Sequence, residues 1–138
     1  MPESPPPRPD TGLLDTSVVI DLGRIAAEAL PVQLAISVIT LAELAAGPPA
    51  AGDPAERARR QDRLQRVEAL FEPLPFDVEA ARAYGRVHAA VVSAGRQPRR
   101  RLADLMIASV AVAHDLPLVT RNAADFAGLE ELLTVIEV

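Results

Sequence analysis

Residues 12–17 have the sequence Gly-Leu-Leu-Asp-Thr-Ser, in which an acidic residue directly follows a short apolar run. An apolar run bounded by turn-forming residues is typical of a buried strand. We therefore predict a strand here and a helix over about 17–30, which Pro31 terminates. The pattern then repeats, because a stretch with β-branched residues over 32–37 leads into a second predicted helix over about 38–46.

Strands and helices keep alternating through the rest of the chain. The predicted helices cover about 54–71, 78–94 and 102–114, the predicted strands cover 117–120 and 134–137, and a turn with a short helix covers 121–133. Such alternation favours a parallel sheet with helices on both faces, so we predict an α/β fold. The helix over 102–114 is apolar almost all round, and we expect it to be buried.

The length of 138 residues is typical of one domain, and a hydrophobic content of 49% is enough for a core. The first nine residues hold five prolines, so we predict a disordered Pro-rich tail over 1–10 and a single domain over 11–138. That tail lacks the apolar core of a signal peptide, and no apolar run approaches the roughly 20 residues of a membrane-spanning helix. We therefore expect a cytoplasmic protein with no membrane partner.

The composition excludes several kinds of chemistry. The chain has no cysteine, which excludes disulfides, thiolate metal sites and thiol nucleophiles. All 14 basic residues are arginine, so the lysine of a P-loop or of a Schiff base is absent. A net charge of −5 argues against binding nucleic acid through bulk positive charge, but it allows a metal-dependent nuclease, whose own site must be acidic.

The candidate catalytic residues are the acidic side chains Asp15, Glu43, Asp104 and Asp125. Each also has a purely structural interpretation. Asp15 could cap a helix, and Glu43 could be the partner in a capping box. Asp104 could be favoured by the dipole of a first helical turn, and Asp125 could be a turn residue. However, the carboxyl ends of parallel strands share one crevice, which would gather all four. Their mutual repulsion would raise their pKa values, and a divalent cation would relieve it. Oxygen ligands favour Mg²⁺ or Mn²⁺.

Four segments of the sequence together resemble a known family. They are residues 13–17 with Asp21, residues 40–44, residues 103–108 and residues 117–126. The resemblance is to the PIN-domain family and, within it, to the VapC-type toxins of bacterial toxin–antitoxin modules. The segments occur in the order and at the spacing of that family. The resemblance implies a three-layer α/β/α PIN-like fold with a mostly parallel sheet, and a metal-dependent endoribonuclease.

The family's acidic set corresponds to the same four side chains. The resemblance implies that Asp15 and Asp104 hold Mg²⁺ (or Mn²⁺) directly, and that Glu43 and Asp125 act directly or through water. A metal-activated water would then hydrolyse the RNA phosphodiester bond, with no protein nucleophile. The supporting polar residues implied beside the acids are Thr16, Ser17, Thr120 and Asn122.

A basic segment lies just before Asp104. Its arginines could bind phosphates that flank the cleaved bond, or they could form a solvated loop; they are Arg96, Arg99, Arg100 and Arg101. The arginines of the predicted helix over 54–71 are expected to face water, paired in part with Glu56 and Asp62.

The resemblance also implies protein partners. Members of the family bind an antitoxin in a groove near the active site, and they commonly form homodimers or heteromers with the antitoxin. The candidate groove residues are Val18, Val19, Leu22, Ile25, Leu41 and Leu44, for which core packing is an equal explanation.

Three other functions remain open or are disfavoured. A PIN-type RNA-processing nuclease without an antitoxin would carry the same acids, and only a neighbouring antitoxin gene or relieved toxicity would separate the two. A catalytically silent PIN binding module is disfavoured because the acidic set is intact. A phosphatase of the haloacid-dehalogenase type would need an aspartate at position 17, where the residue is Ser17, and a lysine, which the chain lacks.

Overall fold

The computed structural model describes residues 8–138, and within them the central sheet has four strands. The strands are β1 (Thr11–Leu14), β2 (Gln33–Ala35), β3 (Leu118–Thr120) and β4 (Val135–Glu137). Their order across the sheet is β2-β1-β3-β4, and every neighbouring pair is parallel. The predicted parallel sheet is therefore confirmed.

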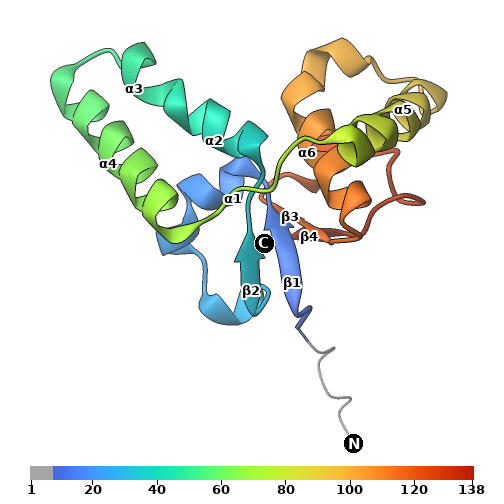
Figure 1. Ribbon diagram of the computed structural model, residues 1–138, viewed down its shortest axis with the longest axis horizontal. Coiled ribbons are helices and arrows are strands. Elements are labelled where there is room, and N and C mark those ends of the chain that lie inside the picture. The colour runs from blue at the N-terminus through green and yellow to red at the C-terminus, as the bar shows by residue number, and fades with distance from the viewer. Residues whose placement is uncertain (1–7) are drawn as a thin grey trace, which may run out of the picture.

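The helices connect these strands. The α-helices are α1 (Thr16–Ile20), α2 (Val38–Ala45), α3 (Gly47–Ala50), α4 (Pro54–Leu70), α5 (Val78–Ser93) and α6 (Leu102–Ala113). The single 3₁₀ turns are η1 (Leu22–Arg24), η2 (Ala27–Ala29), η3 (Pro98–Arg101) and η4 (Ala123–Phe126). Figure 1 shows α2, α3 and α4 as one group and α5 and α6 as another, on opposite sides of the molecule.

Neighbouring residues of β1 pack on opposite faces of the sheet. Leu13 belongs to the apolar core that α5 and α6 form, whereas Leu14 belongs to the core that α1, α2 and α4 form. Leu118 and Val119 of β3 divide between the two cores in the same way. Because successive side chains of a strand point to opposite faces, the sheet is covered on both sides, which gives three layers.

The three long helices of the structure begin where the sequence predicts. Asp53 caps α4, since its side chain accepts a hydrogen bond from the backbone N–H of Glu56 at 2.8 Å. Asp77 caps α5 in the same way, through the N–H of Ala80 at 3.0 Å. The α6 helix buries six of its twelve residues, as its apolar sequence predicts.

The predicted helix over 17–30 is wrong. The α1 helix ends at Ile20, and the turns η1 and η2 replace the rest. Asp21 leaves helical geometry at φ −98° and ψ 12°, and Ile25 is extended. Gly23 lies between them, and a glycine disfavours a helix interior by about 1 kcal/mol relative to alanine.

The predicted tail over 1–10 lies mostly outside the described residues, because the structure describes the chain from residue 8 onward. Residues 8–10 run beside the segment that leads into β2. The Arg8 side chain donates to the carbonyl of Leu30 at 2.8 Å, and the N–H of Gln33 donates to the carbonyl of Asp10 at 2.7 Å. Within residues 8–138, no helix has the length and apolar character needed to cross a bilayer.

Candidate active site

Asp15 directly follows β1 at the carboxyl edge of the sheet, and it is only 5% exposed. One carboxylate oxygen accepts the N–H of Thr16 at 2.9 Å. The other accepts the hydroxyl of Ser17 at 3.0 Å and the hydroxyl of Thr120 at 2.9 Å. Since Thr120 ends the neighbouring strand β3, hydrogen bonds from two strand ends hold this carboxylate in one orientation.

Glu43 lies on α2 and faces the same edge. Its carboxylate accepts a hydrogen bond from the Thr16 hydroxyl at 2.6 Å, and that hydroxyl also lies 3.0 Å from the hydroxyl of Thr40. The capping-box interpretation of Glu43 is wrong, because Ser37 rather than Thr40 caps α2. The Thr16 hydroxyl therefore joins Glu43 directly to the residue that follows Asp15.

Asp104 lies in the first turn of α6, with 22% of its side chain exposed. Burial is the largest cause that raises its pKa, to about 6, and the negative charges of Asp15, Asp125 and Glu43 raise it further. The positive charge of Arg101 acts in the opposite direction. The other three acidic residues singled out in the sequence thus all lie close enough to Asp104 to act on its charge.

Asp125 lies on η4, where an arginine joins it to Asp104. Arg101 places Nη2 3.1 Å from Oδ1 of Asp125 and Nη1 3.8 Å from Oδ2 of Asp104. From the sequence, Arg101 could bind RNA phosphates or belong to a solvated loop, and neither interpretation included these ion pairs. The spacing of three residues between Arg101 and Asp104 in a helical segment was the only signal for one of them.

The donor set fits a divalent cation that prefers oxygen. Within residues 8–138, no three acidic or histidine side chains lie close enough together to surround an ion by themselves. However, Mg²⁺ commonly binds through one or two carboxylates and completes its shell with water. The pKa of Asp104 is raised first by burial and then by the negative charges of the other three acids, and a cation beside it would favour its charged form.

The supporting polar residues differ in what they contact. Thr16, Ser17 and Thr120 all donate to the carboxylates of Asp15 or Glu43, as described above. Asn122 joins this network through its backbone, because its N–H donates to the Thr120 hydroxyl at 3.0 Å. Its side chain is exposed.

The arginines of the basic segment differ in whether their side chains contact the rest of the protein. Arg96 donates from Nη1 to the carbonyls of Ala124 at 2.9 Å and Ala127 at 3.1 Å, so it holds the loop around η4. Arg96, Arg100 and Arg101 line one pocket beside Asp125, whereas Arg99 does not.

On α4, Glu56 pairs with Arg59 and Arg60, and Asp62 pairs with Arg66. The pairing expected for the arginines of this helix is therefore confirmed.

The candidate groove residues do not all reach the surface. Val18, Val19 and Leu44 are buried in the core, so core packing explains them. A groove of about 440 Å³ lies between the α1–η1 segment and α4, and Val19 and Leu22 contribute to its lining. Its exposed apolar side chains are Ile20 and Leu70, and its rim carries Arg24, Arg63 and Arg66.

Comparisons with known proteins agree with this architecture. The family model of the PIN domain matches residues 12–132. Ribonuclease VapC5 of Mycobacterium tuberculosis is 43% identical over 130 residues, which cover 92% of this chain and 93% of that protein. Ribonuclease VapC of Rickettsia bellii is 30% identical over 128 residues, which cover 87% of this chain and 91% of that protein.

A solved structure of a VapBC-family toxin–antitoxin system, VapBC-5 from Mycobacterium tuberculosis, has a TM-score of 0.80 and 38% sequence identity. The match covers 94% of this chain and all of the solved chain. The family model covers most of this chain, and the relatives match it over nearly their whole length. The chain therefore belongs to the PIN domain family.

Proposed function

We propose that this protein is an endoribonuclease that requires a divalent metal ion and acts as the toxin of a toxin–antitoxin pair. The observation that carries the proposal is the cluster of four acids, in which the charges of Asp15, Glu43 and Asp125 help to raise the pKa of Asp104. Relatives that are named ribonucleases support RNA as the substrate class. An RNA substrate and an antitoxin partner would both be met in the cytoplasm, which is where we expect the protein to act.

Asp15 and Asp104 would hold Mg²⁺ or Mn²⁺ directly, and Glu43 and Asp125 would do so directly or through water. A bound ion lowers the pKa of a water molecule and offsets negative charge on the phosphoryl oxygens. Thr16 holds the Glu43 carboxylate at the residue that follows Asp15, through a hydrogen bond of 2.6 Å from its hydroxyl. The reaction is a hydrolysis, in which the oxygen of water joins phosphorus and the departing sugar oxygen takes a proton.

The apolar groove beside α4 is the proposed binding site for the antitoxin. Ile20 is 46% exposed and Leu70 is 74% exposed, although both are large apolar residues. The arginine rim favours an amphipathic segment that carries acidic residues, because opposite charges steer and align such a partner. The solved VapBC-5 complex supports an antitoxin heteromer. A homodimer of the chain stays a prediction that sedimentation can check.

The function is tested by RNA cleavage with purified wild-type protein, in Mg²⁺ or Mn²⁺ and in EDTA. Asp104→Asn is compared with Asp62→Asn, which makes the same chemical change on the exposed face of α4. We expect cleavage only with metal, full activity in Asp62→Asn, and at least about a hundredfold loss in Asp104→Asn. Cleavage in EDTA, or unchanged cleavage by Asp104→Asn, would contradict the proposal.

A second experiment separates the toxin from an RNA-processing nuclease. Expression of the wild-type chain alone should arrest growth, and co-expression of the product of an adjacent gene should restore it. Normal growth, with active enzyme present in the cells, would favour the nuclease without an antitoxin.

A further inference from the structure

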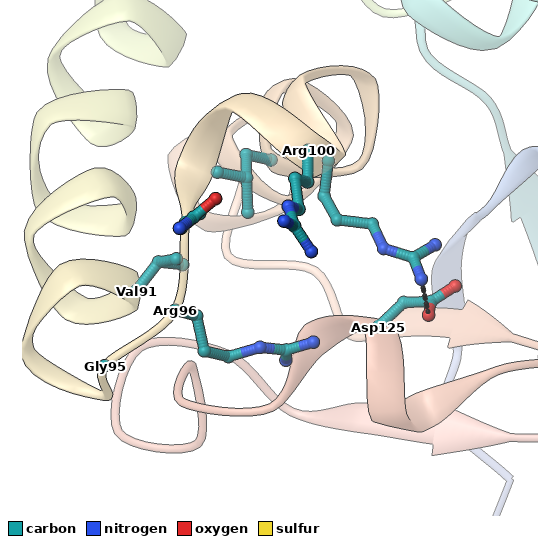
Figure 2. A pocket seen from close by; sticks show the side chains of 8 residues that line it. Val91, Gly95, Arg96, Arg100 and Asp125 are labelled. Carbon is teal, nitrogen blue, oxygen red and sulfur yellow. Dashed lines mark ion pairs between the residues drawn. The ribbon is translucent and has the colours of Figure 1, made fainter.

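A pocket of about 380 Å³ borders the acidic site at Asp125, where the end of α5, the η3 turn, α6 and η4 meet. Arg96, Arg100 and Arg101 contribute to its lining, and Asp125 borders it on the side of the acids. Figure 2 shows the side chains of Arg96 and Arg100 reaching into this space, with Asp125 at its edge. The pocket is thus basic, although the whole chain has a net charge of −5.

The three arginines of the pocket differ in the partners of their side chains. Arg96 is held by two carbonyl oxygens, and Arg101 is paired with Asp125. By contrast, the Arg100 side chain has no hydrogen-bond or ion-pair partner among the residues that the structure describes. A guanidinium group without a partner is available for a phosphate, which its planar arrangement of N–H groups fits well.

The other walls of the pocket suit a nucleobase. Val91 and Leu105 are buried, at 5% and 2% exposed, and supply a small apolar wall, and the Gln97 side chain supplies an amide that can donate and accept hydrogen bonds. A base has flat apolar faces and a polar edge, so it can use both kinds of wall. The volume also lies within the range of about 300–1,000 Å³ that is usual for small-ligand pockets.

The pocket and the acidic site share Asp125, and Arg101 joins them. We infer that the pocket binds one nucleotide of the RNA next to the cleaved bond, with its phosphate on Arg100 and its base between Gln97 and the apolar wall. This inference rests on the proposed ribonuclease function. An acidic side chain of a protein partner fits less well, because it would leave the Gln97 amide and the apolar wall without a partner.

The inference is tested by fluorescence anisotropy with labelled hexaribonucleotides of adenosine, cytidine or uridine. The full chain is used in EDTA, where metal-dependent cleavage is blocked. Arg100→Gln is compared with Arg57→Gln, the same charge change at an exposed position of α4. We expect Arg100→Gln to weaken binding about tenfold for all three RNAs and to lower the salt dependence by about 0.7 in log–log slope, while Arg57→Gln matches the wild type.

A second variant tests the base-binding half of the pocket. Gln97→Ala should reduce the differences in affinity among the three RNAs, with a smaller effect on their average affinity, because only the base edge loses a partner. Thermal unfolding of each variant checks that the fold is kept. A Gln97→Ala protein with the wild-type pattern of affinities would overturn the assignment of a base to this pocket.

The remaining outcomes separate this inference from the proposed function. If the wild type cleaves RNA but Arg100→Gln binds RNA as tightly as Arg57→Gln, the pocket assignment is overturned and the function stands. If Arg100→Gln instead loses only antitoxin binding, the pocket holds an acidic side chain of that partner, and the nucleotide assignment is overturned. If the wild type neither binds nor cleaves RNA, both proposals fail.

Discussion

The charged form of Asp104 is disfavoured by burial and by the acids around it. Burial and three neighbouring acids raise its pKa from 3.8 to about 6, and Arg101 offsets only part of this. Between these two pH values the folded protein binds a proton on Asp104 that the unfolded chain releases. The folded state therefore loses stability as the pH rises through this window, when no metal is bound.

Asp104→Asn should consequently stabilise the metal-free protein at neutral pH. A shift of about two pKa units, reduced for partial solvent exposure, predicts a gain of about 1–2 kcal/mol in the free energy of unfolding at pH 7.5. The gain should shrink as the pH falls through 6 towards 4. Urea unfolding in EDTA at several pH values measures it, with Asp62→Asn as the control. A destabilised Asp104→Asn protein at pH 7.5 would contradict this electrostatic account.

Arg101 supplies the positive charge that a bound metal would otherwise supply. Because its guanidinium is paired with Asp125 and lies near Asp104, the metal must compete with it. Arg101→Gln should therefore bind Mn²⁺ several-fold to about tenfold more tightly than the wild type. Isothermal titration calorimetry measures this, with Arg59→Gln, which loses an ion pair on α4, as the control. Unchanged or weaker Mn²⁺ binding would show that Arg101 does not compete.

Single residues of the site differ in how far the sequence could predict them. Asp15 could be chosen because its place after a buried strand follows from the hydrophobic pattern. The contact between Thr16 and Glu43 could not, since it depends on the angle between α1 and α2. The ion pair between Arg101 and Asp125 depends in the same way on how η3 packs against η4.

At the scale of elements, long helices were predictable and short turns were not. The α4, α5 and α6 helices have clear caps or continuous apolar faces, and their predicted limits are within one residue of the structure. The segment from Asp21 to Leu30 has helical composition but folds as two 3₁₀ turns. Gly23 disfavours a helix here by about 1 kcal/mol, a local preference small enough that tertiary packing can override it, so the sequence alone did not decide the outcome.

Replacing each of two glycines near α5 by alanine should change the stability of the protein in opposite directions. Gly128 has φ +96°, and a Cβ there would lie 2.8 Å from the Cβ of Ala94. Gly85 lies within α5, and a Cβ there would meet nothing within 4 Å. Gly128→Ala should cost about 1–3 kcal/mol of stability. Gly85→Ala should add about 0.5–1 kcal/mol. Thermal and urea unfolding check both variants, and a harmless Gly128→Ala would contradict the packing of the η4 loop on α5.

At the scale of the whole molecule, the alternation of strands and helices was sufficient to predict a parallel sheet. The strand order β2-β1-β3-β4 could not be read from that alternation, because many orders are compatible with it. The order matters for function, since it makes β1 and β3 neighbours and so places Thr120 beside Asp15. The resemblance to the PIN-domain family implied the three layers but did not give this order either.

The proposed antitoxin groove depends on the tertiary fold, because α1 and η1 form it together with α4, which is distant in the sequence. Leu70→Glu places a charge in the groove and should weaken the antitoxin complex at least about tenfold without changing RNA cleavage. Val92→Glu, on the exposed face of α5, is the matched control. Co-purification with the antitoxin measures the effect. Equal recovery of antitoxin with both variants would place the interface elsewhere.

If the four acids hold a divalent cation together, an anomalous difference map from a crystal of the full chain grown with Mn²⁺ should show the ion. We expect a strong peak in contact with Asp15 and Asp104, with the Arg101 guanidinium moved away from Asp125. An empty map at these carboxylates, with Mn²⁺ bound elsewhere or Arg101 still paired with Asp125, would show that the acids do not form such a site.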